Sequence, residues 1–257
     1  MRSALPALLL AALLVTAGCA EVLGPSRPPS DQRAVDAVDR SLAATADVES
    51  YRFTFDGGAE ASKDHEQVQL DVGGEGVVDV TGMRMNVTTR ADDDTRRVYM
   101  TDEAAYRECA TPWSGWGREN LSGSTEWLNY TPAGEQLALL DRTDVYWRGT
   151  ETVDGTEAAV VVAYPTKDEL RSVAEAQGTD VTDLSNVNLQ NATVTVWIAE
   201  ETGLLLKARR DLEMKRRGAT ATVTVTFRFS GYDEPVNVTR PPFDEDDVWE
   251  TEGCPGE

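Results

Sequence analysis

Thiol and imidazole groups are the side chains of this sequence with the most scope for chemistry, and they are few. The chain of 257 residues has three cysteines, Cys19, Cys109 and Cys254, and one histidine, His65. They form no Cys-x-x-Cys or Cys/His arrangement, so we expect no zinc site. His65 lies in the charged stretch 63–66, with no nucleophile motif and no cofactor fingerprint beside it. Because no constellation meets the geometric requirements of an active site, we expect neither an enzyme nor a cofactor.

Two acidic runs and one glycine-rich turn are weaker candidates for ion binding. The runs 92–94 and 244–247 carry consecutive carboxylates, but they lack the spacing and the glycine of an EF-hand loop. The glycine-rich turn 73–76 is not followed by a helix, as a phosphate-binding loop requires. We therefore expect no bound metal.

The charge of the chain restricts its partners. It has 24 basic and 45 acidic residues, a net charge of −21, which excludes general nucleic-acid binding. Only four of the basic residues are lysines, and the acidic residues are spread over the whole length. Such a coat is typical of extreme halophiles, because molar salt screens the self-repulsion. An ordinary acidic secreted protein is the alternative.

The N-terminal residues indicate export. An apolar run, 4–17, is too short to span a bilayer and has the length of a signal-peptide core. It ends in Thr16-Ala17-Gly18-Cys19, which resembles the lipobox of secreted lipoproteins, with Thr16 where leucine is usual. We expect residues 1–18 to be a signal peptide, and Cys19 to carry a lipid that anchors the protein to the outer face of the cytoplasmic membrane. A plain secretory signal is the alternative.

Residues 19–30 contain three prolines and a glycine and are expected to be a tether to a single domain, 31–257, with an acidic C-terminal tail.

In an exported chain Cys109 and Cys254 form an even pair, which favours a disulfide over two buried thiols. Asparagine-x-Ser/Thr sequons predict glycosylation at Asn86, Asn120, Asn191 and Asn237. A fifth sequon, at Asn129, is followed by a proline that hinders modification.

Period-two alternation of apolar residues dominates residues 51–229 and predicts half-buried antiparallel strands. The alternating runs are 51–55, 68–72, 83–87, 160–164, 194–198, 204–206, 212–214 and 223–229. Three stretches predict helices instead: 31–46 after Ser30 as N-cap, 132–141 opening on a proline, and 166–177 with a capping box. The fold class is mainly β (α+β): a large curved antiparallel sheet or incomplete barrel with a few helices covering one face.

Short motifs in this order resemble the LolA/LppX-like superfamily of lipoprotein carriers and lipid-binding lipoproteins, and in particular lipobox-bearing surface lipoproteins of haloarchaea. They are the lipobox, a short helix, Ser50-Tyr51-Arg52-Phe53-Thr54-Phe55, the segment 149–155, the segment 196–204 with Lys207, and Phe229-Ser230-Gly231-Tyr232 before Pro241. The resemblance implies an incomplete barrel whose concave apolar face receives acyl chains or another hydrophobic ligand.

On this basis we expect a membrane-anchored protein outside the cytoplasm that binds a lipid or other hydrophobic ligand. The alternative is a cell-surface interaction or sensing module without a cavity. Three tryptophans, Trp113, Trp116 and Trp127, fit a lid, a membrane-facing edge or packing at the rim of the barrel. The alternating strands place these candidate ligand-binding residues: Phe53, Phe55, Met83, Met85, Val196 and Phe227. Filling of a closed core is the competing role for each of them.

Overall fold

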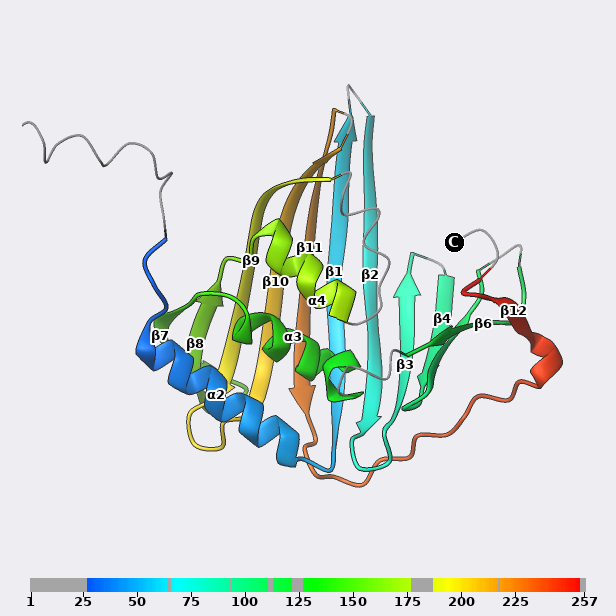
Figure 1. Cartoon of the computed structure of the whole chain (residues 1–257), viewed down its shortest axis with the longest axis horizontal. Coiled ribbons are helices and arrows are strands. Elements are labelled where there is room, and N and C mark those ends of the chain that lie inside the picture. The colour runs from blue at the N-terminus through cyan, green and yellow to red at the C-terminus, as the bar shows by residue number, and fades with distance from the viewer. Residues whose placement is uncertain are drawn as a thin grey trace, which may run out of the picture.

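The described strands of this protein belong to one 12-stranded sheet (Figure 1). The computed structural model describes residues 27–63, 66–92, 94–110, 113–121, 127–176, 187–216 and 218–254. The strand order is β12-β6-β5-β4-β3-β2-β1-β11-β10-β9-β8-β7, and only the β12/β6 pair is parallel. The expected mainly β fold, with helices on one face, is therefore confirmed, and the sheet stays open between its edge strands β12 and β7.

The strands are long in the middle of the sheet and short at the β12 edge. Their bounds are β1 Ser50–Lys63, β2 Glu66–Asp79, β3 Arg84–Ala91, β4 Asp94–Met100, β5 Ala104–Glu108, β6 Trp116–Asn120, β7 Val145–Val153, β8 Thr156–Ala163, β9 Asn188–Ala199, β10 Leu205–Arg216, β11 Ala219–Ser230 and β12 Val248–Glu252. The alternation found β1, β2, β3, β8, β9, β10 and β11. It missed β4, β5, β6, β7 and β12.

Three α-helices lie on one face of the sheet (Figure 1). They are α2 Gln32–Asp47, α3 Pro132–Asp141 and α4 Lys167–Ala176, and two 3-10 turns are η1 Trp127–Tyr130 and η2 Glu245–Asp247. Both ends of each α-helix lie within one residue of the predicted bounds. The predicted N-cap of α2 was wrong, however: Asp31 caps the helix by accepting from the Arg33 amide, while Ser30 accepts from the Val145 amide at 3.2 Å.

The core fills the space between this face and the helices. Its buried members come from α2, α3 and α4 and from the sheet strands, including Ala37, Leu139 and Val173 on the helices and Tyr51 and Ile198 on the sheet. Helix α3 is buried almost all round, because it packs on η1, α2 and α4. The helices therefore seal one part of the apolar face of the sheet.

The acidic C-terminal segment is not a free tail. Residues 231–247, here called the strap, run from β11 past the ends of β1, β2 and β3 to the β12 edge (Figure 1). Ser50 Oγ donates to the Glu234 carbonyl at 2.6 Å, and Asn86 Nδ2 donates to the Thr239 carbonyl at 2.9 Å. These bonds hold the strap against the sheet.

The signal peptide, Cys19 and most of the predicted tether lie outside the described residues. The last part of the tether, 27–30, contacts the sheet, where Tyr146 donates its hydroxyl hydrogen to the Pro28 carbonyl at 2.7 Å. Within the described ranges, no helix is long and apolar enough to cross a membrane.

Candidate ligand-binding site

An aromatic cluster lies at the centre of the inner face, the face of the sheet that the helices cover. Register pairs Phe53 of β1 with Phe229 of β11, and Phe55 with Phe227. The Phe55 and Phe227 ring centroids are 5.6 Å apart, and those of Phe227 and Phe229 are 6.3 Å apart with nearly parallel planes. Tyr51 extends the cluster beneath α3, with its ring centroid 6.1 Å from that of Phe229.

Glycines of β2 make room for these rings. Phe53 lies opposite Gly76 and Phe55 opposite Gly74. A Cβ atom on Gly76 would lie 2.5 Å from two ring carbons of Phe53, and one on Gly74 would lie 2.6 Å from two ring carbons of Phe55. Both rings therefore lie over the glycine backbone of β2, where no side chain of that strand occupies the inner face.

The structure separates the six predicted ligand residues into three groups. Phe53, Met85 and Val196 are buried in the core, and Phe55 and Phe227 are only partly buried at its margin. Met83 lies off the inner face, in the turn before β3, where its φ of 48° interrupts the alternation and its side chain is 42% exposed. The expectation that Met83 belongs to a strand was therefore wrong.

Beyond Phe55 and Phe227 the inner face continues as an apolar trough. In Figure 1, β1, β2, β10 and β11 run past α4 toward their hairpins. Register places small residues of β1 in the middle of this region, between larger apolar residues of β2 on one side and of β11 and β10 on the other. We call this group the trough: Gly57, Ala59 and Ala61 form the floor, and Val68, Leu70, Val72, Leu212, Val223 and Val225 form the walls.

The walls of the trough are accessible to solvent. Val68 is 66% exposed and Leu70 is 36% exposed, while Val72, Leu212, Val223 and Val225 are half-buried. Gly57 permits a close approach of β1 to β11, since its Cβ would lie 2.1 Å from the Thr224 carbonyl oxygen. Two hollows, of about 400 and 430 Å³, are lined mostly by polar residues of the opposite, outer face, and the first of them also includes Ala61 and Val68.

A polar cluster, absent from the sequence-based candidates, lies between α3 and the inner face of β10. Arg210 donates from Nε to Gln136 Oε1 at 2.7 Å and from Nη1 to Glu135 Oε1 at 2.9 Å. Nearby, the hydroxyl of the fully buried Tyr51 accepts from the Ala133 amide at 3.2 Å, and burial raises the pKa of Tyr51 well above its usual value. Sequence offers no signal for this cluster beyond a charged residue in an apolar alternation.

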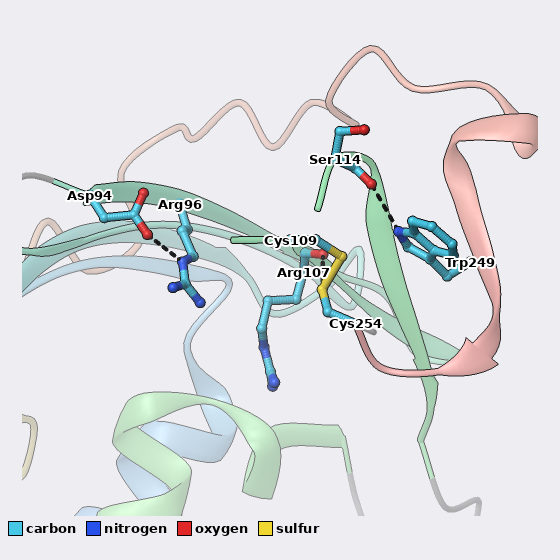
Figure 2. Close-up of a disulfide and its surroundings, with 7 residues drawn as sticks. All are labelled: Asp94, Arg96, Arg107, Cys109, Ser114, Trp249 and Cys254. Atoms are coloured by element: carbon cyan, nitrogen blue, oxygen red, sulfur yellow. Dashed lines mark hydrogen bonds and ion pairs between the residues drawn. A yellow bond between two sulfur atoms is a disulfide. The ribbon is translucent and has the colours of Figure 1, made fainter. Parts of the chain in front are cut away.

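The disulfide expected between Cys109 and Cys254 is present in the structure (Figure 2). It joins the end of β5 to the segment after β12, so it fixes the far end of the strap. Beside it, the Trp249 indole donates to the Ser114 carbonyl at 2.9 Å, and the Trp249 and Trp113 rings meet edge to face.

The three tryptophans of the predicted rim do not act as one group. Trp116 is buried and stacks on Phe243, and Trp127 donates from its indole to the Thr101 carbonyl at 3.0 Å. Trp113 is 47% exposed. Packing therefore accounts for Trp116 and Trp127, and of the three only Trp113, with its partner Trp249, is largely exposed.

The predicted sequons differ in accessibility. Asn120, Asn191 and Asn237 are exposed. Asn86 is half-buried, and its amide nitrogen, the atom that a glycan would modify, donates to the strap. Glycosylation at Asn86 would attach a sugar to the nitrogen that makes this contact and leave it a single hydrogen to donate.

Within the described residues, no group of three or more histidine, cysteine or acidic side chains is arranged to hold a metal ion. His65 and Asp93 lie outside the described residues. Asp94 of the first acidic run instead accepts from Arg96 Nε at 2.8 Å (Figure 2).

No protein-family model matches the sequence, and the curated proteins contain no significant match. Solved structures of similar fold include lipoprotein LppX of Mycobacterium tuberculosis, with 17% identity and a TM-score of 0.49 over 82% of this chain and 100% of that one. LprF of Mycobacterium bovis has 14% identity and a TM-score of 0.45 over 83% and 99%. A LolA-superfamily protein of Nitrosomonas europaea has 11% identity and a TM-score of 0.29 over 83% and 98%. The similar structures thus include the LppX and LolA-superfamily proteins that the sequence motifs resemble.

Proposed function

We propose that this protein binds a lipid or another hydrophobic ligand in the trough, and that it does so outside the cytoplasm while anchored to the membrane through Cys19. One observation carries the binding proposal: the apolar inner face does not end with the core but continues as partly exposed aliphatic side chains on both sides of a floor of small residues. Apolar surface of this kind is costly in water, at about 25 cal/mol per Å². A ligand chain lying on it would remove that cost.

The trough has the form that suits an extended chain. Its floor, Gly57, Ala59 and Ala61, lies along one strand, so the row of small side chains extends over about five residues, or roughly 16 Å at 3.3 Å per residue. Phe55 and Phe227 close its inner end. A ligand in this position would complete their partial burial and continue the hydrophobic core beyond the helices.

The anchoring proposal rests on the sequence. The lipobox-like Thr16-Ala17-Gly18-Cys19 ends a short apolar run, and the residues that the structure describes begin at Arg27. A diacylated cysteine gives the two chains that stable membrane attachment needs. Residues between Cys19 and the sheet would then hold the trough close to a source of lipid.

Glutamine substitutions distinguish a ligand groove from a filled core. Val225→Gln, in the half-buried wall, is expected to abolish Nile red binding and the co-purification of lipid, detected by mass spectrometry, while the melting temperature changes little. Val196→Gln, in the fully buried core, should lower stability by several kcal/mol, because it buries an unsatisfied amide. Thr222→Gln, on the exposed outer face of the same strand as Val225, is the matched control and should change neither property.

The proposal fails if the wild-type protein carries no lipid and binds no dye at any salt concentration. It also fails if Val225→Gln and Thr222→Gln bind the dye equally well.

A surface interaction module is the second candidate, and the Trp113/Trp249 pair favours it. These side chains are 47% and 37% exposed at the β12 edge. Tryptophan is enriched at the centres of protein interfaces. Replacing both with alanine should leave dye binding in the trough unchanged, and it should abolish partner capture if this edge is the functional surface.

A further inference from the structure

Basic residues lie at the end of the trough that is remote from the aromatic cluster. The trough ends there at two hairpins: β1 ends at Lys63 before β2, and β10 ends at Arg216 before β11. The two hairpins are neighbours, because Ser62 of β1 pairs in register with Thr220 of β11. The outer end of the trough is therefore bordered by two cationic side chains.

Lys63 and Arg216 both belong to the inner face. Lys63 is the next inward residue of β1 after Ala61, the last residue of the floor, and Arg216 lies four residues after the wall residue Leu212 in β10. Ala219 pairs with Arg216, and the β1/β11 register carries it opposite Lys63. Adjacent strands are about 4.8 Å apart, so the two basic residues lie about 10 Å apart on either side of an alanine. Their long side chains can both reach an anion above Ala219.

A ligand in the trough has open access to these two cations. The side chains of Lys63 and Arg216 are exposed. In the row before them, the two central positions are Ala61 of β1 and Ala221 of β11, which pair in register. Small side chains therefore continue the floor as far as the basic residues, and the apolar groove passes directly into a cationic end. This is the complement of an amphiphile with an anionic headgroup.

The basic charge at the hairpins contrasts with the charge of the whole chain. Residues 215–217 are the only three consecutive basic residues of the sequence, and Lys63 and Lys215 are two of its four lysines. Among the described strand residues of the last row, Lys63 and Arg216 are accompanied by one acidic residue, Glu66, the register partner of Lys63. The chain as a whole has a net charge of −21. A local excess of cations on such a protein favours an anionic group at this place.

We propose that the ligand is an anionic lipid, whose headgroup is bound by Lys63 and Arg216 while its hydrocarbon chain lies in the trough and points toward Phe55 and Phe227. This inference rests on the function proposed above and adds the class of headgroup and the direction of the ligand. A phosphate or carboxylate between an ammonium and a guanidinium accepts charge-assisted hydrogen bonds, which are stronger than neutral ones. The floor of roughly 16 Å accommodates one extended chain behind that headgroup.

Three probes with the same hydrocarbon chain test the inference: dodecyl phosphate, dodecanol and dodecylammonium. Each is used below its micelle concentration to displace Nile red from the full chain, so any affinity for the apolar N-terminal run is common to the three. At about 0.1 M KCl we expect dodecyl phosphate to bind about tenfold more tightly than dodecanol, and dodecylammonium to bind less tightly than dodecyl phosphate. Because the total charge of −21 favours the ammonium, a preference for phosphate has to arise from local contacts. The preference should narrow at about 1 M KCl, where salt screens the charges.

Glutamine substitutions locate the headgroup. Lys63→Gln and Arg216→Gln each remove one cation from an exposed position, so the fold should be unaffected. Each should weaken the binding of dodecyl phosphate severalfold and leave the binding of dodecanol unchanged. Lys207→Gln is the matched control, because it removes the same charge from the outer face at the other end of β10, about 30 Å from Arg216. It should retain the full preference for the phosphate.

Inorganic phosphate distinguishes a lipid headgroup from a free anion. At the concentration at which dodecyl phosphate saturates the protein, inorganic phosphate should not displace it, since it has no chain to bury in the trough. Displacement by inorganic phosphate, equal binding of dodecyl phosphate and dodecanol, or tighter binding of dodecylammonium overturns the inference and leaves the proposed function standing. Equal losses of dodecyl phosphate binding in Lys63→Gln and Lys207→Gln also overturn it. Failure of all three probes to bind the wild type overturns the proposed function itself.

Discussion

Adding one methyl group at Gly76 tests the arrangement of the inner face. In Gly76→Ala the new Cβ would lie 2.5 Å from Cε1 and Cζ of Phe53 and 2.7 Å from the Asn86 carbonyl oxygen. Carbon atoms in favourable contact are about 3.5–4.0 Å apart, so the ring has to move by about 1 Å. Phe53 is 2% exposed and packed on all sides, and the Asn86 carbonyl belongs to the β3 backbone.

The expected magnitude follows from two opposing effects. Overpacking a core costs about 1–3 kcal/mol, whereas replacing glycine by alanine stabilises by about 0.4–1 kcal/mol through the unfolded chain. We therefore expect Gly76→Ala to lose about 1–2 kcal/mol, which corresponds to a fall of about 2–8 °C in melting temperature for a domain of this size. Urea unfolding followed by circular dichroism, with the slope checked for constancy, measures the loss.

Gly73→Ala is the matched control on the same strand. The nearest atom to its added Cβ is the Phe55 carbonyl oxygen at 3.3 Å, and no aromatic ring lies within 4 Å of that Cβ. Its stability should stay within about 0.5 kcal/mol of the wild type. A double-mutant cycle of Gly76→Ala with Phe53→Ala should be less than additive, since the second change removes the ring that the methyl group displaces. Equal stability of Gly76→Ala and Gly73→Ala, or strict additivity in the cycle, would refute the reasoning.

Four further changes have outcomes that the sequence and structure predict. Replacing Cys109 and Cys254 by serine should destabilise the protein by about 4–5 kcal/mol on the chain-entropy argument for a separation of 145 residues, measured by urea unfolding; a loss below 1 kcal/mol would contradict it. The Arg97 guanidinium holds the pKa of Glu108 below its usual value, so this pair stabilises the folded state above the unfolded pKa of about 4.3, and the stabilisation disappears as the pH falls through the lower folded pKa. Glu108→Gln should flatten that part of the stability profile; an unchanged acid limb would argue against the pair. Cys19→Ser should release the protein from membranes or leave an unprocessed precursor, and continued membrane retention of a processed form would exclude the anchor. Finally, the melting temperature should rise between about 0.1 M and 1 M KCl, where the Debye length falls from about 10 Å to about 3 Å; a flat response would count against a halophilic protein.

Amphipathic patterns identified the parts of this fold that face a single core. The three helices were placed to within one residue, because α2 and α4 each have an apolar stripe and a capping residue at the start, and α3 opens on a proline followed by clustered leucines. The β4, β5 and β6 strands were missed, because their inner face carries charged residues such as Arg96 and Arg107 in place of an apolar alternation. Met83 was misassigned, because an alternating pattern does not reveal that one of its positions has a positive φ.

The candidate site could be predicted only in part for a related reason. Alternation placed Phe55 and Phe227 on one face, but it did not indicate where the helices stop covering that face. Val196 is buried and Val225 is half-buried, although both alternate with polar neighbours in the same way. The Gln136–Arg210 contact joins residues 74 positions apart, and no local pattern encodes it.

The hydrophobic core ends and the trough begins at one row of residues in the sheet. Phe55 and Phe227 are the last aromatic residues of the inner face, and beyond them β1 changes from aromatic to glycine and alanine. Gly57, the first small residue, Val225 and Arg210 are consecutive register partners. The side chains of β1 therefore become small in the same row of the sheet in which Arg210 lies. The trough and the Arg210 cluster therefore begin at the same level of the sheet. A ligand that fills this level would bury the exposed edges of both rings, and it would stabilise the folded state by an amount that depends on its concentration relative to its Kd.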